Sequence, residues 1–115
     1  MNDVNGKLQY RDKEYPLVFN LNVMERIQDE YGTLDEWGAL TDGKSGEPNA
    51  KAVIFGFTEM INEGIDIQND ENGTNEPFLN KKQVGRIITE IGLVNATKTL
   101  NQTVVESTQS SEKNA

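Results

Sequence analysis

The first candidate for a chemical site is the Gly43-Lys44-Ser45 triplet, which could belong to a phosphate-binding loop. Residues 38–45 satisfy the G-x-x-x-x-G-K-[ST] spacing of a phosphate-binding loop. Such a loop needs a helix directly after it, because the helix N-terminus binds the phosphates. Gly46 and Pro48 follow the triplet instead, and no long hydrophobic strand precedes it. We therefore expect no nucleotide site here.

A second stretch partly fits a calcium-binding loop. Asp70, Asn72 and Gly73 occupy its third, fifth and sixth positions. However, Gln68 stands at the first position and Leu79 at the twelfth, where an acidic residue and a bidentate Glu are required. The sequence favours a solvated loop over a calcium site.

Two acidic pairs, Asp29-Glu30 and Asp35-Glu36, could serve as catalytic carboxylates. Acidic residues near helix ends are more often solvated or capping residues, and no second chemical group converges on these pairs. The chain contains no histidine and no cysteine, which removes the usual general base, the thiolate nucleophile and the commonest metal ligands. We predict no enzyme activity, no catalytic residue, no cofactor and no metal site.

The charge of the chain restricts its partners. The formal net charge is −8 at pH 7 over 115 residues, and the sequence pI is near 4.5. A field of this sign repels phosphate, so we expect neither nucleic acid nor an anionic membrane as a partner. We find no run of about 18 apolar residues and no signal-peptide pattern. These features predict a soluble protein of the cytoplasm.

The elements that must position any site begin with a β-hairpin. Residues 7–11 and 14–19 are β-prone runs joined by a polar turn. A helical apolar period follows, with Asn22 as the expected N-cap and Gly32 as the end. A short helix is predicted over 35–40, because Thr33 and Glu36 fit a capping box at its start.

The second half of the chain is predicted to contain two longer helices. The more apolar one covers 50–62 and ends at Gly64, and an acidic loop without periodicity follows over 65–80. The last helix is predicted over 81–100. Residues 1–102 then form one compact domain, and 103–115 form a disordered polar tail.

Together these elements predict an α+β fold, mainly helical, with an N-terminal β-hairpin packed on three to four helices. Leu, Ile, Val and Phe make up 28 of the 115 residues, enough for a modest core. The central helix has a wide apolar face, formed by Ile54, Phe55, Phe57 and Ile61. This face is our candidate for binding a partner helix. The alternative is that all of it is buried against the hairpin and the last helix.

Several short segments occur in the order found in a known family. They are residues 6–24, which include Tyr15-Pro16-Leu17-Val18-Phe19, then 25–32, Leu34-Asp35-Glu36-Trp37, 60–65, Pro77-Phe78-Leu79 and 83–88. Over about residues 5–95 the chain thereby resembles phage tail assembly chaperones from viruses and prophages of Gram-positive bacteria.

The resemblance implies a small helical protein made in the cytoplasm of the infected bacterial host. Such a protein keeps the long tape-measure protein soluble while tail-tube subunits assemble around it. The tape-measure protein would be its partner, and the tail-tube protein a second candidate. The family has no catalytic residues to transfer, and self-association is left open.

Two other interpretations stay open. The first is a structural tail or connector component of the virion. The second is an acidic DNA-mimic inhibitor, which would present rows of carboxylates. The acidic residues of this chain cluster near 25–36 and 63–76. The basic residues of 81–86 argue against a DNA mimic.

Overall fold

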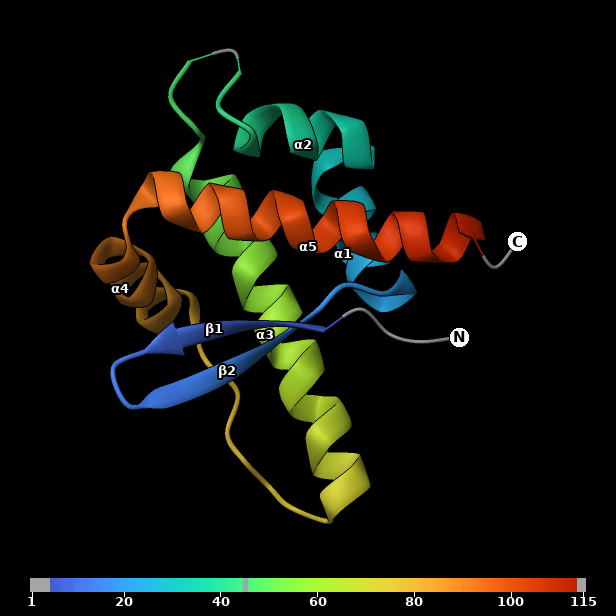
Figure 1. Cartoon of the computed structure of the whole chain (residues 1–115), viewed down its shortest axis with the longest axis vertical. Coiled ribbons are helices and arrows are strands. Elements are labelled where there is room, and N and C mark those ends of the chain that lie inside the picture. The colour runs from blue at the N-terminus through green and yellow to red at the C-terminus, as the bar shows by residue number, and fades with distance from the viewer. Residues whose placement is uncertain (1–4, 45, 114–115) are drawn as a thin grey trace.

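The chain forms an N-terminal hairpin followed by helices, described for residues 5–44 and 46–113 in a computed structural model (Figure 1). The elements in chain order are β1 (Asn5–Tyr10), β2 (Lys13–Val18), α1 (Leu21–Tyr31), α2 (Leu34–Thr41), α3 (Ala50–Asn72), α4 (Lys81–Ile91) and α5 (Leu93–Lys113). The predicted α+β, mainly helical class with an N-terminal hairpin is confirmed.

The hairpin is a two-stranded antiparallel sheet in which Tyr10 pairs with Lys13 and Leu8 with Tyr15. Its two-residue turn lies at Arg11 and Asp12, one residue earlier than predicted, and Arg11 adopts a positive φ of 58°. A hairpin of this size needs other elements packed on it to be stable. β2 packs on α3 and β1 packs on α5, which provide that cover.

Helix α3 is the centre of the molecule (Figure 1). It contacts β2, α1, α2, α4 and α5. Its first two thirds are lined with buried apolar residues, and its C-terminal end projects beyond the hairpin. The surrounding core is a single cluster of apolar side chains, of which the largest fully buried are Trp37, Phe57, Leu17, Ile27, Met60, Ile61 and Leu100.

Two glycines allow neighbouring elements to approach α3 closely. A Cβ atom added to Gly56 would lie 2.4 Å from the Trp37 ring, and one added to Gly64 would lie 2.7 Å from Pro16. The Trp37 indole N–H also donates to the backbone oxygen of Ala52, at 3.0 Å. Glycine therefore sits in this helix where α2 and β2 cross it, and close packing offsets its low helix propensity.

The predicted end of the central helix at Gly64 is wrong, because α3 continues to Asn72. Ile65 supplies further buried apolar surface after Gly64, being only 6% exposed. The helix ends at Gly73, which adopts the left-handed conformation that favours glycine, with φ of 65°. The first half of the predicted acidic loop, 65–72, is consequently helical, and 73–80 form a loop.

The single helix predicted over 81–100 is also wrong. Gly92 has φ of 98° and ψ of 136°, which interrupts the helix between α4 and α5. An L-residue would be strained in this conformation, so glycine allows the chain to change direction here. Helix α4 begins with a capping box formed by Asn80 and Gln83. The predicted cap of α1 likewise moves, from Asn22 to Asn20.

The predicted disordered tail from residue 103 differs from the structure, in which α5 continues to Lys113. The Thr103 and Ser107 side chains are 4% and 9% exposed and lie one helical turn apart. The Thr103 hydroxyl donates to the Thr99 carbonyl at 2.9 Å, so this polar side chain can be buried next to Gly6 of β1. Residues 114 and 115 lie outside the described residues.

Candidate functional site

The apolar face predicted to bind a partner is mostly core. Phe57 and Ile61 are 0% exposed, and Phe55 is 8% exposed. Ile54 is half-buried and faces α4, where its Cδ1 lies 3.6 Å from the position of a Cβ on Gly85. Apart from Ile54, these residues belong to the packing of α3, as in the alternative interpretation of this face.

The motif-like stretches do not form the sites that they resemble. Residues 38–41 are the last turn of α2, and a bend rather than a helix follows Gly46. Residues 68–72 are helical, so their side chains cannot wrap around a cation as a calcium loop does. Within 5–44 and 46–113, no three acidic, His or Cys side chains are grouped to hold a metal ion. In the same ranges, no helix has the length and apolar character needed to cross a membrane.

Tyr31 carries an unusual buried hydroxyl. Its oxygen is buried without a hydrogen-bond partner among the described residues, and its ring meets Phe55 edge to face with centroids 5.4 Å apart. Burial raises the pKa of the Tyr31 hydroxyl, and the neighbouring Glu30 carboxylate raises it further. The Tyr31 hydroxyl therefore stays protonated at neutral pH, and its ring packs against Phe55.

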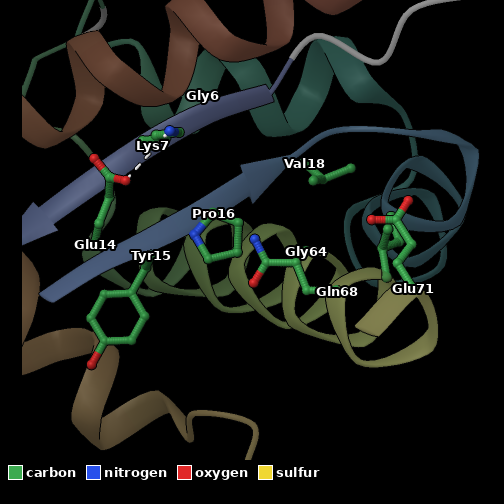
Figure 2. Close-up of a pocket in the computed structure, with 10 residues that line it drawn as sticks. Gly6, Lys7, Glu14, Tyr15, Pro16, Val18, Gly64, Gln68 and Glu71 are labelled. Atoms are coloured by element: carbon green, nitrogen blue, oxygen red, sulfur yellow. Dashed lines mark ion pairs between the residues drawn. The ribbon is translucent and has the colours of Figure 1, made fainter. Parts of the chain in front are cut away.

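One surface hollow lies between the hairpin and α3 (Figure 2). It has a volume of about 240 Å³, with β2 residues Tyr15, Pro16 and Val18 on one side and α3 on the other. The Lys7 ammonium and the Glu14 carboxylate, 3.4 Å apart, pair across the strands at its edge. Pro16 has no N–H to offer to an added strand, so this side of β2 is poorly suited to extending the sheet.

A second hollow, which we call the apolar groove, separates α2 from α5 and has a volume of about 530 Å³. Its apolar lining consists of Leu34, Trp37, Gly38, Ala39, Val104 and Val105. Its polar lining consists of Asp35, Asp42, Lys44 and Asn101.

The two walls of the apolar groove are fixed by core contacts. Trp37 anchors α2 on α3, and Leu100, which is 0% exposed, anchors α5 in the core. Gly38 and Ala39 have the smallest side chains and leave the space between the helices open. Val105 is 48% exposed, so apolar surface at this groove faces solvent.

A third feature, which we call the acidic groove, runs between α1 and α3. It consists of two hollows of about 710 and 340 Å³ that share Glu25, Arg26 and Glu59. Its carboxylates are Glu25, Asp29, Glu30, Glu59, Glu63 and Asp66. Phe55 lines one end and Phe78 lines the other.

Helical spacing accounts for the acidic groove. Glu25 and Asp29 lie one turn apart on α1, and Glu59, Glu63 and Asp66 recur at four and three residues on α3, so each set shares a helix face. These spacings are readable in the sequence. The pairing of α1 with α3 that brings the two faces together is not.

Polar contacts hold the two walls of the acidic groove together. Glu63 accepts hydrogen bonds from the amides of Asn20 and Asn22, at 2.8 and 3.0 Å. The Arg26 guanidinium lies 3.6 Å from the Glu59 carboxylate. The α1–α3 surface is therefore organised before any partner arrives.

Comparisons of the chain with models of protein families, with curated proteins and with solved structures found no match.

Proposed function

We propose that this protein is a phage tail assembly chaperone that binds the tape-measure protein and keeps it soluble during tail morphogenesis, without performing chemistry. The proposal places it in the cytoplasm of the infected bacterium. It is supported by the residue order over 5–95, which resembles that family.

The observation that carries the proposal is the apolar groove. A tape-measure protein is expected to be long and helical with exposed apolar stripes, and a helix of this kind can lay its stripe into a groove between two helices. The face that we first considered, around Phe57 and Ile61, is occupied by the protein's own core. The apolar groove replaces it as the proposed binding surface, with Val104 and Val105 on one wall.

The net charge of −8 fits the same role. Complexes that carry a large charge of one sign repel one another, which opposes aggregation of the bound chains. Buried apolar contact is not screened by salt, so the binding itself should survive high ionic strength.

Co-expression with the cognate tape-measure protein tests the proposal. We expect that protein to move from the insoluble to the soluble fraction, in a complex that persists at high salt. Val105→Asp should abolish this effect, because it puts a charge into the apolar groove. The matched control is Val94→Asp, which also changes an exposed valine of α5 (65% exposed) but lies outside the groove.

Two results would contradict the proposal. If the tape-measure protein stays insoluble with this chain in excess, the chaperone function is wrong. If the chain is a stoichiometric component of purified mature particles, a structural tail or connector role replaces it. Equal loss of solubilisation in Val105→Asp and Val94→Asp would instead reject the apolar groove as the binding surface.

A further inference from the structure

We propose that the acidic groove binds a cationic amphipathic helix of a partner protein, with an apolar side chain of that helix against Phe78. This surface is separate from the apolar groove, so the inference does not depend on the chaperone proposal. Binding at the apolar groove would rest on apolar contact, whereas binding at the acidic groove would rest on charge, with one aromatic contact.

The first argument is the charge of the groove. Six carboxylates line it, against the single guanidinium of Arg26. Arg26 pairs with Glu59, and Glu63 is satisfied by two asparagine amides. Among the residues that the structure describes, the other four carboxylates take part in no ion pair and no side-chain hydrogen bond. The groove therefore keeps an excess of negative charge to which a cationic partner is attracted.

The second argument is exposed apolar surface in the same place. Phe78 is 55% exposed and lines the groove, and Leu21, at the start of α1, is 78% exposed. In the sequence, Leu21 lies between the two asparagines that bind Glu63, although it does not itself line the groove. Large apolar side chains exposed beside a groove are typical of a protein contact.

Phe78 is held in position rather than left on an irregular loop. The amide of Asn62 donates to the Leu79 carbonyl and its oxygen accepts from the Leu79 N–H, both at 2.9 Å. These two bonds tie the backbone next to Phe78 to the middle of α3. Because this backbone is already fixed, binding of a partner to Phe78 costs little conformational entropy in this segment.

The third argument is the size of the groove. Along α3 it extends from Phe55 to Asp66, which corresponds to roughly 16 Å at the helical rise per residue. About three turns of a partner helix match this length. Lysine or arginine side chains of that helix could reach the carboxylates of both walls.

Charge complementarity selects this occupant over others. A second copy of the chain carries the same net charge of −8, and nucleic acids and anionic lipids are repelled as well. A metal ion is disfavoured, because no grouping of three acidic side chains close enough to hold one is found in the described residues. A cationic helix satisfies both the carboxylates and Phe78.

Binding of synthetic peptides to the full chain tests the inference. The probe is a helix of about 14 residues with leucines on one face and lysines on the other. One control replaces its lysines by glutamates, and a second replaces its leucines by alanines. NMR titration at about 0.05 M salt should show the lysine–leucine peptide shifting the amides of Leu21, Glu25 and Phe78, with either control at least about tenfold weaker.

Two double variants locate the effect. Glu25→Lys with Asp66→Lys changes the groove, whereas Asp12→Lys with Asp70→Lys changes exposed residues outside its lining. Both double variants change the net charge from −8 to −4, since each replacement adds two positive charges. We expect about a tenfold loss of affinity in the first and little change in the second.

Phe78→Ala should weaken the lysine–leucine peptide but leave the lysine–alanine peptide unaffected. Equal weakening by the two double variants would show that only the overall charge matters and would overturn the groove as the site. Equal binding of the glutamate peptide, or no loss in Phe78→Ala, would overturn the proposed chemistry of the partner.

Discussion

The two parts of α3 have the same regular backbone but opposite surroundings. Residues 50–64 are enclosed by other elements and include Phe57 and Ile61, which are 0% exposed. Residues 65–72 form the end of α3, and after Ile65 their side chains are exposed or half-buried. The comparison shows that continuous helix does not imply continuous core: tertiary packing stabilises the first part, and local bonds at the helix end stabilise the second.

The largest predicted difference between the two parts concerns phenylalanine. Phe57→Ala should lower the free energy of unfolding by about 3–5 kcal/mol, because it empties a fully buried site at the middle of α3. Chemical denaturation measures this change. The same substitution at Phe78, which follows the projecting part and is 55% exposed, should change stability by no more than about 0.5 kcal/mol. If both substitutions lowered the free energy of unfolding by similar amounts, the burial of Phe57 would add nothing to stability beyond what an exposed phenylalanine provides.

Two helical glycines, Gly56 in the enclosed part of α3 and Gly85 in α4, allow the effect of close packing on stability to be compared. Gly56→Ala places a Cβ atom 2.4 Å from the Trp37 ring, so it should cost about 1–3 kcal/mol in spite of the better helix propensity of alanine. Gly85→Ala meets only Ile54 at an ordinary 3.6 Å and should gain up to about 1 kcal/mol. Thermal unfolding followed by the fluorescence of Trp37 distinguishes them. A stabilising Gly56→Ala would contradict the close approach of α2 to α3.

The smallest effect is expected at the projecting end of α3. The Asn69 side chain bonds both the N–H and the carbonyl of Glu76 and the hydroxyl of Thr74, at 2.9 to 3.1 Å. Asn69→Ala should therefore cost about 1 kcal/mol and raise hydrogen exchange mainly over 73–80, leaving the core amides protected.

The control for this variant is Asp70→Ala, which removes an exposed neighbouring side chain that makes no hydrogen bond in the described structure. If Asn69→Ala instead raises exchange in the core of α3, the two parts of the helix unfold as one unit, and the distinction between them fails.

Sequence patterns were sufficient for the elements with local signals. The hairpin, the helix ending at Gly32 and the short helix capped by Thr33 follow from alternation, a terminal glycine and an N-cap, and the structure confirms them within one or two residues. Capping and turn formation depend on neighbours within about four residues, so one sequence contains the needed information.

The candidate sites depended on contacts between distant residues. Nothing local shows that Phe57 is covered by the protein's own core while Val105, in a segment predicted to be disordered, lies at a groove. Composition suggested a tail there because Thr and Ser are polar, but their hydroxyls can bond the preceding helical turn and become buried, as at Thr103.

By itself the sequence determined the helical character, the acidic charge and the helix faces on which carboxylates and apolar residues recur. Only the tertiary structure decided which of those faces meet. Glycines have the same appearance in a sequence wherever they occur. However, Gly64 lies inside a helix and has Pro16 packed on it, whereas Gly92 interrupts a helix at φ of 98°. A residue without a Cβ atom permits either outcome, so the glycine by itself does not show which of the two the fold adopts.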